Sequence, residues 1–188
     1  ALNLVSSPGA GKTTLLERTL DEFGRQTRCA VVVGDLETDN DGLRLHRPHA
    51  PVAQITTGGT CHLDAAMIAR GVESLDLAGV RVLFIENVGN LVCPASFDLG
   101  EQVRVVLLST TEGEDKPLKY PPIFKSAHLV LLTKVDVADA LGFKRDVAVA
   151  NIRRIAPQAR IIQLSSRSGE GLPEWYDFLR GLAPAAKA

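Results

Sequence analysis

The sequence predicts an α/β fold built on a doubly wound, mostly parallel sheet, and two observations support this. Short, continuous apolar runs recur along the chain, as expected of parallel strands that are covered on both faces. Stretches with helical character lie between these runs, and such alternation is typical of doubly wound sheets. The 188 residues suffice for one domain with a substantial core. We expect this domain to span residues 1–182 and to end in a frayed tail at 183–188.

The predicted elements are placed from the apolar runs and from the stretches between them. Strands are predicted at residues 2–5, 29–33, 80–85, 103–108, 129–132 and 160–164. Helices are predicted at residues 14–20, 63–75, 144–155 and 172–182. The polar, proline-rich stretch EGEDKPLKYPP, residues 112–122, is expected to be a loop.

The run SSPGAGKTT, residues 6–14, joins the first predicted strand to the first predicted helix. Strand, glycine-rich loop, Lys-Thr and helix in this order form the phosphate-binding loop of P-loop NTPases. Its glycines let backbone N–H groups face an anion, and the helix N-terminus adds partial positive charge. Only Ser6 departs from the pattern GxxxxGK(S/T), which has glycine there. The residues expected to bind nucleotide are Pro8, Gly9, Ala10, Gly11, Lys12, Thr13 and Thr14, with Lys12 on the β/γ-phosphates and Thr13 on Mg²⁺.

The stretch TKVD, residues 133–136, resembles the guanine-recognition motif (N/T)KxD of G-protein-like GTPases and predicts GTP or GDP as the ligand. The Asp136 carboxylate can accept hydrogen bonds from guanine N1–H and the 2-amino group, whereas adenine would leave it unpaired. Such sites discriminate by roughly 10⁴-fold or more. Thr133 and Lys134 belong to the same motif, and the Lys134 stem could pack over the base. Ser165, Ser166 and Arg167 resemble the loop that completes a guanine pocket.

Two acids at strand ends are candidates for the Mg²⁺ and switch region. Glu86 begins the sequence ENVG, in which an acid lies near Mg²⁺ and Gly89 lies near the γ-phosphate. Asp35 follows the second predicted strand, and most of the acidic run after it is expected to be a solvated loop. Thr13, Asp35 and Glu86 are therefore the predicted Mg²⁺ ligands. Together with Lys12 they form the candidate catalytic set, to which Asp39 is added as a candidate general base.

Cys61, His62 and Cys93 form a candidate soft-metal site next to the switch region. Thiolate and imidazole favour Zn²⁺ and Ni²⁺ over Mg²⁺, and Cys61 is expected to have a lowered thiol pKa near a helix N-terminus. Three ligands do not complete a structural tetrahedron, but two copies across a two-fold axis would share six. The alternative, buried cysteines and a histidine that starts a helix, remains open. Cys29 is expected to be core only.

The short distance along the chain between the two candidate sites suggests that they communicate. Glu86 and Cys93 are seven residues apart, a span of at most about 25 Å. A movement of residues 86–89 would therefore move the thiol.

Composition restricts the partners. With 21 Lys and Arg against 22 Asp and Glu, the net charge is −1, which argues against nucleic acid or an anionic membrane as the main partner. No apolar run approaches the ~20 residues of a membrane span. The three cysteines and the lack of a secretory signal favour a cytoplasmic, reduced protein.

The motifs SSPGAGKTT, GDLETDND, GGTCHLDA, ENVGNLVCP, TKVD and LSSRSGEGL together resemble the HypB family, the nickel-handling GTPases of nickel–iron hydrogenase maturation. The resemblance covers most of the chain, from Asn3 to Trp175, and CHLDA and ENVGNLVCP are its distinctive parts. It implies a GTPase of the branch that dimerises with nucleotide bound. It further implies a metallochaperone that delivers nickel to a hydrogenase large-subunit precursor together with other maturation proteins. Cys61, His62 and Cys93 would be the Ni²⁺ or Zn²⁺ ligands at the dimer interface.

Three alternative functions remain at this point. The related urease-maturation GTPase carries Cys-Pro-His as its metal motif, whereas here Cys-His and Val-Cys-Pro stand apart. A nucleotide-gated binding or scaffold protein with negligible turnover is the second. The third is a P-loop kinase, which TKVD argues against.

Overall fold

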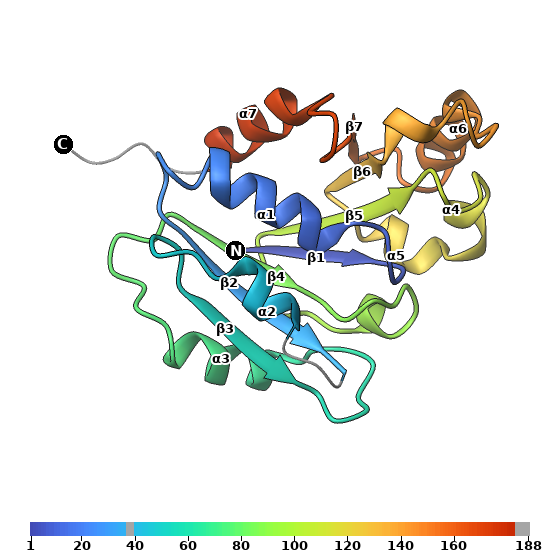
Figure 1. Ribbon diagram of the computed structural model, residues 1–188. Helices are drawn as coiled ribbons and strands as arrows, with labels where there is room; N and C mark the ends of the chain where they lie inside the picture. Colours follow the sequence, from blue (N-terminus) through green and yellow to red (C-terminus); the bar gives the residue numbers. More distant parts are fainter. Residues whose placement is uncertain (37–39, 183–188) are drawn as a thin grey trace.

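The computed structural model describes residues 1–36 and 40–182 and shows a parallel sheet between two layers of helices (Figure 1). The predicted tail at 183–188 and the candidate base Asp39 lie outside the described residues. All pairings within the sheet are parallel, in the order β3-β2-β4-β1-β5-β6-β7. The strands are β1 (Leu2–Ser6), β2 (Cys29–Asp35), β3 (Val52–Thr56), β4 (Val82–Glu86), β5 (Val103–Ser109), β6 (Leu129–Thr133) and β7 (Arg160–Gln163).

Helices connect these strands. They are α1 (Lys12–Glu22), α2 (Asn40–Leu45), α3 (Ala65–Glu73), α4 (Lys116–Lys119), α5 (Pro121–Lys125), α6 (Arg145–Ile155) and α7 (Leu172–Leu182), with short 3-10 helices at Cys93–Ser96 and Val135–Val137. Among the described residues, no helix combines the length and apolar character that a membrane crossing requires.

The sheet is buried on both faces, which explains the continuous apolar runs. Leu4 packs in a cluster with Leu16 of α1 and Trp175 of α7. The next residue, Val5, points to the opposite face and packs in a cluster with Ile152 of α6. On that second face α3 covers β2 and β4. Because neighbouring residues of a strand face opposite sides, strands covered on both sides must be apolar at consecutive positions.

The structure confirms the predicted fold class and corrects several elements. The edge strand β3 and the helices α2, α4 and α5 were missed. The loop predicted at residues 112–122 is wrong, because α4 and the start of α5 lie within it. Each of these two helices has proline in its first turn, where a missing N–H breaks no helical hydrogen bond. Helix α3 begins at Ala65, two residues later than predicted, because the Asp64 side chain caps it by accepting from Met67 N at 2.7 Å.

The topology brings the candidate site residues to one edge of the sheet. Strand β1 lies between β4 and β5, where the order of strands along the chain reverses. Ligands of doubly wound sheets bind beyond the carboxyl ends of the strands at such a point. Ser6, Asp35, Glu86 and Thr133 are the last residues of β1, β2, β4 and β6.

Candidate functional site: a nucleotide pocket beside a thiol cluster

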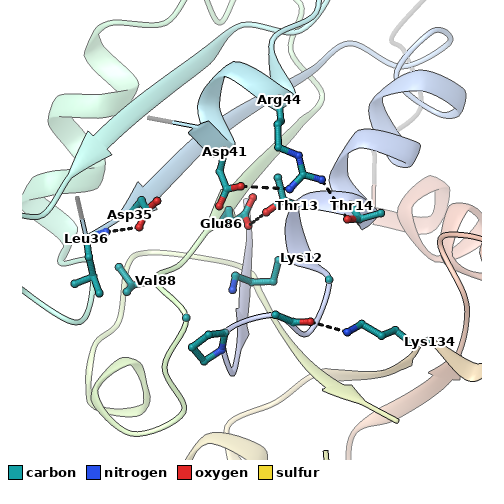
Figure 2. Close-up of a pocket in the computed structure, with 14 residues that line it drawn as sticks. Lys12, Thr13, Thr14, Asp35, Leu36, Asp41, Arg44, Glu86, Val88 and Lys134 are labelled. Carbon is teal, nitrogen blue, oxygen red and sulfur yellow. Dashed lines mark hydrogen bonds and ion pairs between the residues drawn. The ribbon is translucent and has the colours of Figure 1, made fainter. Parts of the chain in front are cut away.

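The phosphate-binding loop connects β1 to α1 and is shaped by two glycines. Gly9 and Gly11 have φ values of 73° and 99°, in the left-handed region that glycine adopts without strain. Gly11 is also the N-cap of α1, so the unpaired N–H groups of the first helical turn face the loop. Above the loop lies a cavity of about 490 Å³ whose lining includes Pro8, Lys12 and Thr14 (Figure 2).

Ser6 lies where the pattern has glycine, and the structure shows why serine fits. It is the last residue of β1 and is fully buried. Its Oγ accepts a hydrogen bond from Lys12 Nζ at 3.0 Å and donates one to Ser7 O at 2.7 Å. An ordinary strand conformation needs no glycine, and the hydroxyl holds the lysine toward the cavity.

Thr13 and Glu86 meet at the floor of this cavity. Thr13 Oγ1 donates to Glu86 Oε1 at 2.7 Å, whereas Glu86 Oε2 is buried without a hydrogen-bond partner. Burial raises the pKa of Glu86 to about 7, although Lys12 and the Thr13 hydroxyl act in the opposite direction. Burial likewise lowers the pKa of Lys12, more than the nearby carboxylates raise it. A buried carboxylate oxygen without a partner, next to a threonine hydroxyl, fits a Mg²⁺ site.

Other residues of the switch region line the same cavity. Asp35 ends β2, and its Oδ1 accepts from Leu36 N at 2.5 Å; both residues line the cavity. Gly89 lies against the phosphate-binding loop, since a Cβ added there would lie 3.0 Å from Pro8 Cα. A side chain at position 89 would push this loop away.

Two residues of α2, missed in the sequence, also line the cavity. Asp41 was expected to belong to a solvated loop, but it lines the cavity, and its carboxylate points toward Arg44, whose Nη1 lies 3.5 Å from Asp41 Oδ1 (Figure 2). Arg44 donates to Glu17 Oε2 at 2.5 Å and lies 3.3 Å from Thr14 Oγ1. A six-residue helix has too little hydrophobic periodicity to be recognised in a sequence.

The predicted base-binding residues line a second cavity of about 210 Å³ that adjoins the first. Thr133 Oγ1 donates to Ala10 O at 2.8 Å, and Lys134 Nζ donates to Gly9 O at 2.8 Å. Both residues thus tie the end of β6 to the phosphate-binding loop. Lys134 has φ 59°, the one positive value at a described non-glycine residue, and such strain often marks functional positions.

The loop after β7 closes the far side of this second cavity. Asp136 lines it together with Ser165, Ser166 and Arg167. Ser165 is fully buried, and its Oγ accepts from Arg167 N at 3.2 Å and from Ser168 N at 3.1 Å. Its hydroxyl therefore shapes the loop, and the residues that follow face the cavity.

Cys61, His62 and Cys93 come together as the sequence predicts. One ligand atom from each lies within 4.8 Å of the others. The two sulfur atoms are 2.8 Å apart, and both cysteines are free thiols. The His62 ring stacks on Phe97 with centroids 3.7 Å apart, and its Nδ1 is buried without a hydrogen-bond partner. This donor set suits a thiophilic metal ion.

The prediction for the Cys61 pKa is wrong. Its hydrogen-bond contact with the Cys93 thiol raises the pKa of Cys61. The expected helix-terminus effect does not apply, because α3 begins at Ala65 and Asp64 occupies its N-cap. Cys29 is a core residue as predicted: it is fully buried, and burial raises its pKa to about 12.

Comparison with known proteins gives consistent matches. A family profile described as "CobW/HypB/UreG, nucleotide-binding domain" matches residues 1–163. Hydrogenase maturation factor HypB of Azotobacter chroococcum mcd 1 is 53% identical over 178 residues, which cover 95% of this chain and 58% of that protein. Probable HypB of Methanocaldococcus jannaschii is 39% identical over 179 residues, 95% of this chain and 81% of that protein. The chain spans only 58% to 61% of the length of the Azotobacter and Escherichia coli K12 relatives.

Solved structures agree with these matches. The crystal structure of HypB from Archaeoglobus fulgidus superposes with a TM-score of 0.90 at 41% identity and covers 97% of this chain and 89% of that one. HypB from Helicobacter pylori in complex with nickel gives a TM-score of 0.90 at 38% identity, covering 100% and 90%. FlhF complexed with GTP and Mg²⁺, at 18% identity, covers 97% and 73% with a TM-score of 0.65 and shares the fold.

Proposed function

Because the chain belongs to the CobW/HypB/UreG family, we propose that it hydrolyses GTP to control nickel binding and nickel delivery during nickel–iron hydrogenase maturation. The observation that supports this most strongly is the short segment that joins the two sites. Glu86 contacts Thr13 at the floor of the phosphate cavity, and seven residues later Cys93 contacts Cys61. A displacement of Glu86 caused by the phosphates would therefore be passed along the backbone to Cys93.

The proposed nucleotide is GTP, held across the two adjoining cavities. The base lies beside Asp136, whose carboxylate accepts from guanine N1–H and the 2-amino group. The phosphates lie over residues 9–13, where Lys12 turns from Ser6 to the β- and γ-phosphates. Thr13, Asp35 and Glu86 would hold Mg²⁺, which neutralises charge on the phosphate oxygens during transfer. Glu86 binds a cation only as the carboxylate, so it must first lose the proton that its raised pKa favours.

The proposed cargo is Ni²⁺, with Zn²⁺ as the competing ion. Cys61 and Cys93 supply thiolates and His62 an imidazole nitrogen, and both ions accept this set. Three protein ligands leave coordination positions open, which suits an ion that is passed on. The nickel complex of the Helicobacter pylori relative supports Ni²⁺ as the ion carried. We propose a hydrogenase large-subunit precursor and other maturation proteins as the recipients.

We propose that the protein acts as a nucleotide- or metal-dependent homodimer. Val92, next to Cys93, has 62% of its surface exposed, so an apolar side chain lies on the surface beside the metal ligands. Two copies that meet there would share two sets of Cys61, His62 and Cys93. Sedimentation velocity with GDP or a GTP analogue tests this, and a Val92→Asp protein should dimerise more weakly.

The experiment that tests the proposed function is a nickel titration in defined nucleotide states. Ni²⁺ affinity is measured by competition with a chromophoric chelator, with GDP bound and with a non-hydrolysable GTP analogue bound. We expect different affinities in the two states. Identical affinities would contradict the coupling, and tighter binding of ATP than GTP would favour a kinase.

Turnover distinguishes the scaffold alternative. A kcat far below ~1 s⁻¹, the low end of ordinary enzymes, would mean that nucleotide binding times assembly and that hydrolysis only resets it. Multiple-turnover phosphate release with and without Ni²⁺ measures this directly.

A further inference from the structure

The segment from Glu86 to Cys93 contacts the nucleotide side and the metal side in turn. Glu86 contacts Thr13, and Gly89 lies against Pro8 of the phosphate-binding loop. Two asparagines, Asn87 and Asn90, each follow one of these residues directly in the sequence. Asn87 forms a hydrogen bond to the backbone of Leu63, next to His62, and Asn90 forms one to the backbone of Cys61 itself.

Asn87 is bonded to the residue that follows His62. Its side chain is 2% exposed, and its Oδ1 accepts from Leu63 N at 3.4 Å and from Val88 N at 3.0 Å. This oxygen therefore bridges residues 61–63, which we call the metal loop, and residues 86–90, which we call the switch segment. The Leu63 bond is at the long end of hydrogen-bond distances, so a small displacement of the segment would break it.

Asn90 is bonded to a metal ligand directly. Its Nδ2 donates to Cys61 O at 3.1 Å, and its Oδ1 accepts from Val92 N at 2.8 Å. Its amide thus holds the Cys61 backbone and the turn that leads to Cys93 in one arrangement. Asn90 directly follows Gly89, so a movement of Gly89 with the phosphates would carry this amide along.

The opposite side of the metal loop rests on fixed structure. Leu63 is fully buried and packs on Gly34 of β2. A Cβ added at Gly34 would lie 2.7 Å from the Leu63 side chain. Phe97 stacks on His62, and its carbonyl accepts from Arg104 Nη2 at 2.7 Å. Arg104 in turn pairs with Glu101 at 2.7 Å, and this pair is almost fully buried. The metal loop is therefore packed against β2 and Phe97 on one side, and on the other side the Asn87 and Asn90 amides link it by hydrogen bonds to residues 86–90.

We propose that Asn87 and Asn90 are positioning residues that transmit the nucleotide state to the Cys61, His62 and Cys93 site through these two backbone hydrogen bonds. This inference rests on the proposed function. When the segment 86–90 moves with the γ-phosphate, the amides shift the backbone at Cys61 and Leu63 and change the spacing of the metal donors. Coupling between two sites of this kind is typically about 5- to 150-fold in affinity.

The test compares the ratio of Ni²⁺ affinities in the GDP and GTP-analogue states between variants. The readout is the sulfur-to-nickel charge-transfer absorption of the full chain. Asn90→Ala removes the bond to Cys61 O at a partly exposed position. Asn87→Ala removes the buried bridge and also the Asn87 Nδ2 bond to Asn3 Oδ1 of β1 at 3.2 Å. Asn151→Ala is the matched control. Asn151 lies on α6, and its Nδ2 also donates to a backbone carbonyl, Glu114 O, at 2.9 Å.

We expect the ratio to fall toward unity in Asn90→Ala and Asn87→Ala, with GDP affinity and the Ni²⁺ absorption of the GDP state retained. Asn151→Ala should keep the wild-type ratio. If Asn87→Ala does not fold, Asn90→Ala alone decides. A wild-type ratio in Asn90→Ala, or an equal loss in Asn151→Ala, overturns the inference and leaves the proposed function intact. A wild-type protein without any difference between states overturns the coupling itself and the inference with it.

Discussion

Replacing Asp136 by Asn tests the guanine assignment with the smallest possible change. The substitution keeps the shape of the side chain and replaces one carboxylate oxygen by an N–H₂ group. The amide can still accept from guanine N1–H, but its N–H₂ group then faces the 2-amino group of the base, donor against donor. Xanthine has a carbonyl at that position, so the variant should bind it better than guanine.

The size of the effect follows from the two hydrogen bonds. A hydrogen bond to a charged group contributes about 1.5–3 kcal/mol. Asp136 lines a cavity open to solvent on one side and is itself exposed, which favours the lower end of that range. Losing one bond and opposing a second donor should cost about 3 kcal/mol, or about 100-fold in GDP affinity. Binding of the phosphates and of Mg²⁺ should survive, because Lys12, Thr13 and Glu86 are unchanged.

Calorimetric titration of GDP, ADP and xanthosine diphosphate measures these affinities. The matched control is Asp139→Asn, which removes the same charge at an exposed position three residues away and outside the cavity lining. We expect weaker GDP binding and stronger xanthosine diphosphate binding only in Asp136→Asn. Unchanged preference for GDP over ADP in that variant would refute the assignment of the base.

Three further predictions concern the metal ligands, the buried acid and the phosphate-binding loop. Cys93→Ser should lower Ni²⁺ affinity at least about 100-fold, since even outer-shell partners contribute 10–100-fold. The control Cys29→Ser, in the core, should leave Ni²⁺ affinity unchanged. Equal Ni²⁺ affinities of wild type and Cys93→Ser in a chelator competition would mean that Cys93 only packs and binds no metal. In nucleotide-free protein the raised pKa of Glu86, about 7 against an ordinary 4.5, means that the folded state binds the proton more tightly. The free energy of unfolding should therefore fall between those pH values by up to about 3 kcal/mol, and urea unfolding of Glu86→Gln should lose this slope. Ser6→Gly should lower the free energy of unfolding by about 1–2 kcal/mol, through the lost bond to Lys12 and strand entropy, while GDP affinity measured by calorimetry stays nearly the same.

The sequence predicted the parts of the site whose chemistry is local. The phosphate-binding loop and TKVD are short runs in which residue type and spacing define the conformation, as the positive φ values of Gly9, Gly11 and Lys134 illustrate. The acids were found because Asp35 and Glu86 end buried apolar strands, and parallel strands end at one edge. The meeting of Cys61 with Cys93 was predicted on other grounds, from the metal-binding chemistry of two thiols and an imidazole beside the predicted switch region.

What the sequence did not predict depends on short elements and tertiary contacts. Strand β3 is half-buried at the sheet edge and has no continuous apolar run. Asp41 and Arg44 reach the cavity from a helix too short to show a period. The direction of the Cys61 pKa shift was predicted wrongly because the start of α3 was predicted two residues too early. That placed the Cys61 thiol closer to the helix N-terminus than the structure does. The support of His62 by Phe97 depends on the buried pair Arg104 and Glu101, which no local pattern reveals.

Under the proposed function, this chain must bind a metal ion selectively and then release it, and the geometry of the site fits both requirements. Two thiols and an imidazole give selectivity for soft ions, while three donors leave the site incomplete. Release then requires only a small change in donor spacing, because coordination bonds depend steeply on geometry. The segment 86–93 can supply that change, since Glu86 and Cys93, at its two ends, contact the phosphate cavity and the thiol cluster. By linkage, an ion that responds to GTP must alter GTP affinity by the same factor. We therefore expect the metal-bound protein to bind GTP and GDP with a different affinity ratio from the metal-free protein.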